Sequence, residues 1–167
     1  MSKALGFIGL GVMGFPMAGH LANQNNNISV FNRTSEKSKI WNTKYTGIVC
    51  KSPAEIAQLS DVIIICIGND NNVRDVISGK DGMINYLKQG SVIVDHTTTS
   101  SDLSIEMNEL LNPNDIFYID APVSGGEAGA QLGQLSIMAG GDKEAFNLIK
   151  NILEPYTKFI KYMGPSG

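Results

Sequence analysis

Three glycines near the start of the chain have the spacing of a site that binds the phosphates of a dinucleotide. Gly9, Gly11 and Gly14 form the pattern G-x-G-x-x-G, between an apolar run at residues 4–8 and a run with helical spacing. In such a motif the glycines allow a tight strand-to-helix turn, close approach of a pyrophosphate and helix–strand packing, and the helix dipole favours the phosphates. A plain glycine-rich turn is the alternative, but the flanking strand and helix favour a dinucleotide site. The residues expected to bind the phosphates are Gly9, Leu10, Gly11, Val12, Met13 and Gly14.

The residues after the second apolar run indicate which dinucleotide would bind. In this type of fold an acidic residue about 20 positions beyond the glycines holds the ribose 2′-hydroxyl of NAD, whereas an arginine accommodates the 2′-phosphate of NADP. Asn32 stands in place of the acid, and Arg33 and Thr34 follow it. The amide does not repel a phosphate, the arginine offers a planar fork of donors, and the threonine adds a hydroxyl. We therefore expect NADP(H) rather than NAD(H), with Thr34 or Ser35 also capping the next helix.

Short apolar runs alternate with segments of helical spacing along the chain. This alternation predicts an α/β fold of the Rossmann type, with a doubly wound, mainly parallel sheet and helices on both faces. The expected strands are residues 4–8, 28–32, 47–49, 62–67, 91–95, 117–120, 135–139 and a weak one at 159–160. Because the sequence has no repeat, linker or composition break, we expect residues 1–167 to form a single domain.

Capping signals and apolar stripes predict several helix boundaries. The first helix is expected over about residues 13–24, with His20 as a partly exposed residue beside its apolar face and a turn at residues 25–27. Ser52 and Pro53 begin a later helix, and Asp142 caps the helix at residues 143–153. A further helix opens at Ser101 and Asp102. The expected apolar stripe of that helix is Leu103, Met107, Leu110 and Leu111.

The composition argues against several classes of protein. The chain is 43% hydrophobic and 17% charged with a formal net charge of −3, and its scattered Lys and Arg residues do not predict a nucleic-acid surface. The longest apolar run, residues 62–67, is too short to span a membrane. The glycine motif lies directly at the N-terminus, so we expect no signal peptide. Cys50 and Cys66 are expected to be reduced core residues, which predicts a cytoplasmic protein.

Three further stretches make the sequence resemble a known family. They are G-N-D-N-N-V-R at residues 68–74, V-D-H-T-T-T-S at 94–100 and D-A-P-V-S-G-G at 120–126. Together with G-F-I-G-L-G-V-M-G at residues 6–14, they resemble the β-hydroxyacid dehydrogenases, relatives of 6-phosphogluconate dehydrogenase. The resemblance runs in the same order along the whole chain. It implies an enzyme that interconverts a small 3-hydroxy acid and its semialdehyde by hydride transfer.

The resemblance also implies roles for individual residues. Ile67, Gly68 and Asn72 would border the adenosine and its ribose, and Thr98 would lie against the nicotinamide. Ser124, Gly125 and Gly126 match the family's substrate segment, where a hydroxyl and backbone N–H groups would hold the carboxylate of a small substrate.

The resemblance places the general acid of the reaction beyond this chain. In the family a Lys-x-x-x-Asn pair follows a segment that matches residues 164–167, and an all-helical second domain closes the cleft. We therefore expect residues 1–167 to bind the coenzyme but to have little dehydrogenase activity alone, and we assign no catalytic residue. The face left by the absent domain is expected to be apolar and to permit self-association.

Two other functions share part of this evidence. A non-catalytic NADP-binding remnant, or a module that acts with a separate partner chain, would keep the same binding residues. A protein that binds FAD or S-adenosylmethionine would use the glycine turn, but it would explain neither residues 32–34 nor residues 124–126.

Three titratable residues at the ends of expected strands receive structural roles. Asp95 and Asp120 do not have the spacing of a carboxylate pair, and we interpret both as structural anchors. His96 could titrate near neutral pH, but the resemblance gives it no part in the chemistry. No group of residues has metal-ligand spacing, so no metal site is expected.

Overall fold

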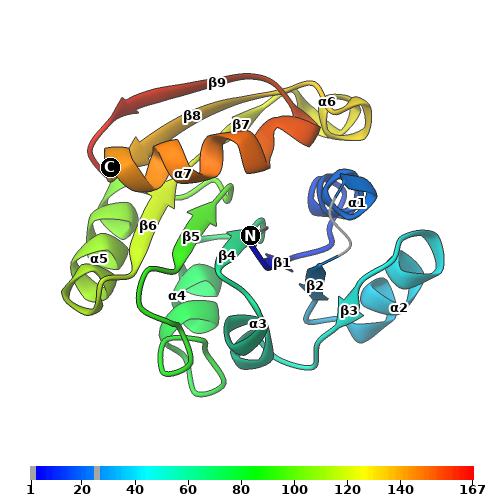
Figure 1. The fold of residues 1–167 in the computed structure, drawn as a ribbon, viewed down its shortest axis with the longest axis horizontal. Helices are drawn as coiled ribbons and strands as arrows, with labels where there is room; N and C mark the ends of the chain where they lie inside the picture. Colours follow the sequence, from blue (N-terminus) through cyan, green and yellow to red (C-terminus); the bar gives the residue numbers. More distant parts are fainter. Residues whose placement is uncertain (1–2, 25–26) are drawn as a thin grey trace.

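The strands form one twisted sheet whose central part is parallel. The computed structural model describes residues 3–24 and 27–167. The strands are β1 (Leu5–Ile8), β2 (Ile28–Phe31), β3 (Ile48–Val49), β4 (Val62–Ile65), β5 (Val92–Asp95), β6 (Phe117–Asp120), β7 (Val123–Ser124), β8 (Leu135–Gly141) and β9 (Thr157–Gly164). The helices are α1 (Gly14–Gln24), α2 (Ser35–Lys44), α3 (Pro53–Leu59), α4 (Asp70–Ser78), α5 (Ser101–Leu111), α6 (Gly126–Leu132) and α7 (Lys143–Leu153), with short 3-10 turns at Asn112–Asn114 and Glu154–Tyr156. Figure 1 shows their arrangement.

The strand order is that of a Rossmann fold, which confirms the predicted fold class. The order β3-β2-β1-β4-β5-β6 is parallel throughout, and the chain reverses its direction of growth between β1 and β4. Beyond β6 the sheet continues through β8, which pairs antiparallel with β6 and β7 and parallel with β9. The sheet is therefore mainly parallel, with antiparallel pairing at one side.

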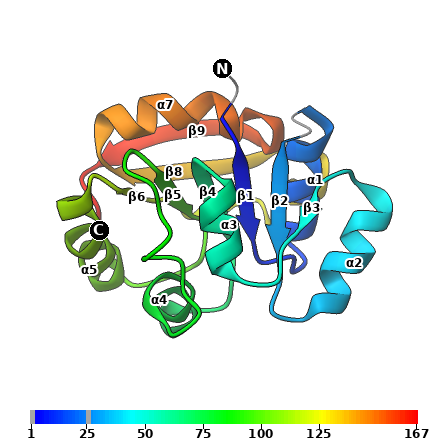
Figure 2. The same cartoon turned by 60° about the horizontal axis from the view of Figure 1, so that its bottom comes forward.

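Two apolar layers cover the faces of the sheet. Helices α1 and α7 pack on one face, and α3, α4 and α5 pack on the other (Figures 1 and 2). Strands β1, β4 and β5 are buried along their whole length, because parallel strands between two helical layers meet apolar side chains on both sides. This burial explains why their sequences are continuous apolar runs.

Several helix boundaries agree with the sequence-based expectations. Helix α1 begins at Gly14, and Ser52 caps α3 by accepting a hydrogen bond from the Glu55 N–H at 3.2 Å. Asp142 caps α7 in the same way through the Ala145 N–H at 2.8 Å. Of the turn expected at residues 25–27, residues 25–26 lie outside the described part of the chain.

Other expectations about the elements were met only in part. The strand expected at residues 62–67 ends at Ile65, and the weak strand expected at 159–160 is present but longer, as β9. Helix α5 begins at Ser101, as expected, with Ser100 as its N-cap, but Leu110 is 38% exposed rather than part of the apolar stripe. The buried face of α5 instead consists of Leu103, Ser104, Met107 and Leu111.

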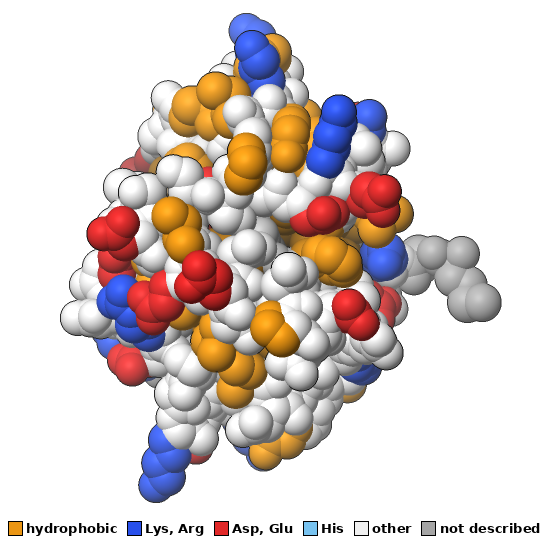
Figure 3. All heavy atoms as spheres, turned by 90° about the vertical axis from the view of Figure 1, so that its left-hand side faces the viewer, with side chains coloured by type: hydrophobic (Ala, Val, Ile, Leu, Met, Phe, Trp, Pro, Cys, Tyr) orange, Lys and Arg blue, Asp and Glu red, His pale blue; other side chains and the backbone are white. Residues whose placement is uncertain are grey.

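The outer face of β8 and β9 carries exposed apolar side chains. Met138, Phe159 and Met163 are 40%, 55% and 62% exposed. Figure 3 shows the face of the molecule that includes the ends of these strands, where hydrophobic side chains lie in separate groups among charged ones. Self-association through an apolar face stays a prediction.

Candidate functional site

The turn after β1 contains three glycines, of which the fold itself requires two. Gly9 has a φ of 102°, and a Cβ there would lie 2.1 Å from the carbonyl oxygen of Cys66. A Cβ on Gly14 would lie 1.9 Å from the carbonyl oxygen of Gly9. A Cβ on Gly11 would meet no atom within 4 Å, because Gly11 borders an open pocket. The fold therefore leaves the space in front of Gly11 to a ligand.

That pocket has a volume of about 670 Å³ and lies where β1, β2 and β4 end. Open α/β sheets bind ligands at the carboxyl ends of their strands, where the strand order reverses. Figure 2 shows β1 and β2 side by side with the same direction, so that their carboxyl ends meet at this edge. The predicted coenzyme residues in the pocket wall are Gly9, Gly11, Val12, Met13, Gly14, Asn32, Arg33, Thr34, Ile67, Gly68 and Asn72.

Two of the predicted coenzyme residues are not in that wall. The side chain of Leu10 is buried, with 2% exposure, and its N–H group already has a partner in Asn32. Thr98 is exposed on the segment that follows β5. A role for Leu10 would therefore be indirect, through the shape of the turn.

The Asn32 side chain joins the end of β2 to the glycine turn. Its Oδ1 accepts a hydrogen bond from the Leu10 N–H at 2.8 Å, and its Nδ2 donates to the carbonyl oxygen of Thr34 at 3.0 Å. The sequence predicted only that this residue would not repel a phosphate. The structure adds that the amide uses both of its ends to fix the backbone around the pocket.

Basic side chains gather at one part of the pocket wall. Arg33 and Lys37 are both exposed, and neither forms an ion pair within the described residues. Lys80 borders the pocket from the end of α4, together with the carboxylates of Asp75 and Asp81. Sequence reasoning missed Lys37. A signal was present, since a lysine in the first turn of a helix opposes the helix dipole.

Thr34 occupies the N-cap position of α2 without the expected hydrogen bond. Its φ and ψ are −86° and 100°, but its side chain makes no capping contact. Thr34 thus has the expected N-cap position, but it does not make the expected capping hydrogen bond. The Thr34 hydroxyl remains available to a ligand in the pocket.

A buried network supports the segment that carries Thr98. Asp95, at the end of β5, is 1% exposed and accepts hydrogen bonds from the Tyr118 hydroxyl at 2.6 Å and the Thr97 N–H at 2.8 Å. Burial raises the pKa of Asp95, and the bonds from Thr97 and Tyr118 oppose that rise. The Thr97 Oγ1 accepts a hydrogen bond from the Ile67 N–H at 3.1 Å. Asp95 is therefore a structural anchor, as expected.

The predicted substrate segment lies apart from the pocket wall. Ser124 ends β7, and Gly125 and Gly126 begin α6 with φ values of 133° and 59°. All three residues are exposed, and a Cβ on Gly126 would meet no atom within 4 Å. Sequence reasoning did not predict β7 or α6.

The side chain of His20 joins α1 to the C-terminal end of α6. It belongs to α1, and its Nε2 lies 3.0 Å from the carbonyl oxygen of Ala130 and 3.1 Å from that of Gln131, near the end of α6. It is half-buried, as expected for a residue beside the apolar face. The contact was not predicted from the sequence.

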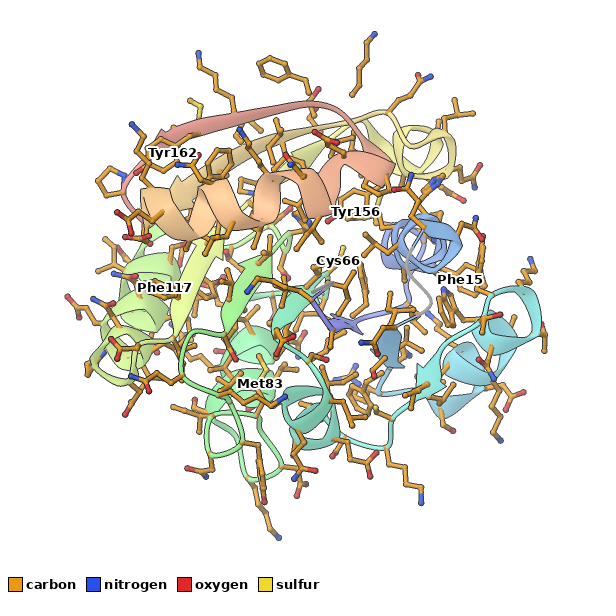
Figure 4. The ribbon with its side chains drawn as sticks, in the orientation of Figure 1. Phe15, Cys66, Met83, Phe117, Tyr156 and Tyr162 are labelled. Atoms are coloured by element: carbon orange, nitrogen blue, oxygen red, sulfur yellow. The ribbon has the colours of Figure 1, made fainter. Side chains whose placement is uncertain are left out.

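Two buried, hydrogen-bonded side chains, His96 and Tyr156, lie near Cys66, which is partly buried and borders the pocket. His96 is 3% exposed; its Nδ1 lies 2.6 Å from the carbonyl oxygen of Ala121 and its Nε2 lies 2.9 Å from the Tyr156 hydroxyl. Figure 4 shows Tyr156 and Cys66 in the interior between α7, α1 and the ends of the central strands. Burial lowers the pKa of His96 to about 4 and raises that of Cys66 to about 12, so both are neutral at pH 7.

Asp120, at the end of β6, is half-buried. Asp120 accepts a hydrogen bond from the Gly167 N–H at 3.2 Å, and burial raises its pKa. Within residues 3–24 and 27–167, no cluster of His, Cys, Asp or Glu has the arrangement of a metal site. No helix in the same part of the chain has both the length and the apolar character needed to cross a membrane. Cys50 and Cys66 are both free thiols; Cys50 is buried, as expected, whereas Cys66 is only partly buried and borders the pocket rather than lying in the core.

Comparison with known proteins shows that this chain is similar to part of several oxidoreductases. A family model described as the NAD binding domain of 6-phosphogluconate dehydrogenase matches residues 4–164. An uncharacterized oxidoreductase of Shewanella frigidimarina is 43% identical over 161 residues, which cover 96% of this chain and 55% of that protein. A probable mitochondrial 3-hydroxyisobutyrate dehydrogenase-like protein of Arabidopsis thaliana is 37% identical, over 98% of this chain and 54% of its own length.

A solved structure provides a comparison that contains a coenzyme. The structure of Psf3 in complex with NADP+ and 2-OPP superposes with a TM-score of 0.89 at 28% identity, over 96% of this chain and 56% of the other. The chain thus spans about half the length of the curated relatives it matches.

Proposed function

The chain belongs to the family of the NAD binding domain of 6-phosphogluconate dehydrogenase, and we propose that residues 1–167 are the NADP(H)-binding domain of a 3-hydroxyacid dehydrogenase or semialdehyde reductase. One observation carries the proposal. The pocket wall combines the glycine turn, the Asn32-Arg33-Thr34 segment and the residues after β4 in a single cavity. These are the three segments from which a sheet of this type holds a dinucleotide.

The residues present fit the coenzyme. The open space in front of Gly11 would admit the pyrophosphate near the positive end of the α1 dipole. Arg33 and Lys37 would pair with the 2′-phosphate, and Thr34 would donate its hydroxyl. Bound NADPH supplies a hydride from C4 of its nicotinamide. The chain's part in the reaction is to orient that group and to favour the phosphorylated coenzyme.

The substrate class follows from the family resemblance and from the relatives' names. The Arabidopsis protein is named for 3-hydroxyisobutyrate, a small acid with a hydroxyl group. The exposed Ser124 hydroxyl and the backbone at Gly125 and Gly126 would hold such a carboxylate, since glycine leaves the N–H groups accessible. Because the chain spans about half of its relatives' length, we assign hydride transfer to a protein of the full length and coenzyme binding to residues 1–167.

A coenzyme-binding module that acts with a separate partner chain is the second candidate. It shares the pocket, so the two candidates differ in whether the general acid and the closing domain belong to the same polypeptide.

The free thiols of Cys50 and Cys66 suit a reducing compartment, and we propose the cytoplasm.

Direct titration with both coenzymes tests the proposal. NADPH and NADH are added separately to the purified chain, and binding is followed by the change in nicotinamide fluorescence. We expect the dissociation constant of NADPH to be at least about tenfold lower, the effect of one charge-assisted contact to the 2′-phosphate. Binding of neither coenzyme would refute the dinucleotide site. Equal or tighter binding of NADH would refute the preference for NADP(H).

A further inference from the structure

The segments that follow β4 and β5 are held together by hydrogen bonds at the carboxyl edge of the sheet. The Ile67 N–H donates to Thr97 Oγ1, as described above. Farther along, the Ser100 hydroxyl donates to Asp70 Oδ2 at 2.5 Å, and the Ser100 N–H donates to Asp70 Oδ1 at 3.2 Å. Residues 67–70 and 97–100 are therefore joined at both of their ends.

The Asp70 carboxylate uses both of its oxygens on a single residue. Ser100 has one hydroxyl hydrogen, which it gives to Asp70, and its oxygen accepts the Leu103 N–H at 3.2 Å as the cap of α5. Asp70 is also the first residue of α4. The carboxylate thus lies at the starts of two helices, where their dipoles favour a negative charge. The bond from Ser100 lowers the pKa of Asp70, so the carboxylate is ionised at neutral pH.

A second contact between the same two helices lies one turn farther along α4. Arg74 on α4 donates three hydrogen bonds to the Glu106 carboxylate on α5, at 2.7–3.0 Å. It also donates to Asn71 Oδ1 at 3.2 Å. Because Arg74 and Glu106 also join the two helices, loss of the Asp70 contacts would free Ser100 without separating α4 from α5. The bond between Ile67 and Thr97 would still hold the other end of the segment.

The two joined segments serve different halves of a dinucleotide. Ile67, Gly68 and Asn72 line the pocket that also contains Arg33, on the β2 side of the glycine turn. A dinucleotide in this fold crosses the switch point, so its second half extends from the glycine turn toward the ends of β4 and β5. The 97–100 segment follows β5 directly and lies outside the pocket wall. It is thus placed to meet the nicotinamide half.

We propose that Asp70 is a positioning residue, which holds the 97–100 segment in the place where it contacts the nicotinamide half of the coenzyme. The inference rests on the proposed function, because it presumes a dinucleotide in the pocket. Asp70 does not touch the coenzyme. It acts through Ser100, which it holds in place before the coenzyme binds. Without this contact the 97–100 segment would have to be ordered on binding, and the cost of ordering it would weaken the affinity.

A pair of ligands that differ only in the nicotinamide isolates this role. NADPH and 2′-phospho-ADP-ribose, which lacks the nicotinamide ring, are titrated calorimetrically into the wild-type chain and the Asp70→Asn variant. Asparagine keeps the size but can accept only one of the two bonds from Ser100. We expect NADPH affinity to fall by about five- to tenfold, the effect of one lost ordering hydrogen bond, and the affinity for the truncated ligand to change less than about twofold.

Matched variants test the effect of charge and the role of the Ser100 hydroxyl. Asp102→Asn removes the same charge from the first turn of α5, and we expect it to leave both affinities unchanged. Ser100→Ala should reproduce the selective loss of Asp70→Asn, and Ser100→Thr should restore NADPH binding because threonine keeps both the donor and the cap. Thermal melts of every variant verify that each one is folded.

The outcomes distinguish this inference from the proposed function. An equal loss of affinity for both ligands in Asp70→Asn, or no loss for either, would overturn the positioning role while leaving the coenzyme site intact. If neither ligand binds the wild-type chain, the proposed function fails and the inference fails with it. A selective loss of NADPH affinity supports both.

Discussion

The Asn32 side chain accepts a hydrogen bond from the Leu10 N–H at 2.8 Å and so ties the end of β2 to the glycine turn after β1. The residue that stands where an acid would select NAD therefore has a second task, since it shapes the loop that receives the phosphates. The two tasks can be separated, because one depends on charge and the other on a hydrogen-bond acceptor.

Asn32→Asp tests the negative charge through the ratio of the two affinities. The carboxylate still accepts the Leu10 N–H but loses the bond that Nδ2 donates to the Thr34 carbonyl oxygen, a change that both coenzymes meet, whereas the new negative charge faces only the 2′-phosphate of NADPH. We expect the ratio of NADPH to NADH affinity to fall by about tenfold or more, since like charges in contact cost several kcal/mol. Fluorescence titrations with both coenzymes measure the ratio. Asn42→Asp, which adds the same charge to an exposed position of α2, is the control and should leave the ratio unchanged.

Alanine variants of Arg33 and Lys37 test whether these side chains bind the 2′-phosphate. We expect Arg33→Ala and Lys37→Ala each to weaken NADPH binding by about 10- to 100-fold while leaving NADH binding nearly unchanged, because only NADPH carries the group they would pair with. Lys39→Ala is the matched control on the same helix, since Lys39 pairs with Glu36 at 3.6 Å and does not border the pocket. Parallel losses for the two coenzymes would place these side chains elsewhere on the ligand.

The glycine turn offers a test that separates binding from folding. A Cβ on Gly11 meets no protein atom, so Gly11→Ala should unfold at the wild-type denaturant concentration or slightly above it. The same methyl group occupies the space of the pyrophosphate, and we expect NADPH affinity to fall at least about tenfold, the effect of about 1.4 kcal/mol.

Gly14→Ala is the reciprocal variant. Its Cβ would collide with the carbonyl oxygen of Gly9, so we expect a loss of about 3 kcal/mol or more in the free energy of unfolding, measured in urea. A Gly11→Ala variant that binds NADPH normally would contradict the assignment of this space to the phosphates.

The parallel part of the fold was predicted well from the sequence, because strands that are buried on both faces have continuous apolar sequences. Residues of β4 and β5 are buried on both faces, and β6 was predicted with its observed bounds. Helix α6 gave no such signal. It has seven residues, buries only Gly129 and Ala130, and depends on contacts such as those of His20 with its last carbonyl groups. Such tertiary contacts cannot be read from local spacing.

The wall of the candidate site was predictable where it follows a local motif. The glycine turn and residues 32–34 lie in consecutive stretches, and the structure brings both into one pocket. The bond between Asn32 and Leu10, and the presence of Lys37, depend on where side chains point after two strands pair. For the same reason Leu110 was misplaced, since the rotation of α5 on the sheet brings Ser104 inward instead.

The buried His96 has a defined tautomer. Its Nδ1 faces the Ala121 carbonyl oxygen, which can only accept, so Nδ1 carries the hydrogen and Nε2 accepts one from the Tyr156 hydroxyl. Burial lowers the pKa of this imidazole from 6.5 to about 4. The folded state thus favours neutral His96, whereas the unfolded chain is protonated more readily.

The lowered pKa of His96 makes the fold sensitive to acid in a defined window. The stability that the folded state gains from keeping His96 neutral is fully present above pH 6.5 and is lost as the pH falls toward 4. This loss lowers the free energy of unfolding by up to about 3 kcal/mol. Asp95 acts in the opposite direction, because its raised pKa favours the folded state as the pH falls. Urea unfolding from pH 7.5 to 4.5 should therefore be compared between the wild-type chain and His96→Gln, which retains Asp95. We expect the variant to be less stable at pH 7.5 and to lose less stability on acidification. Profiles that run parallel would show that His96 does not set this pH dependence.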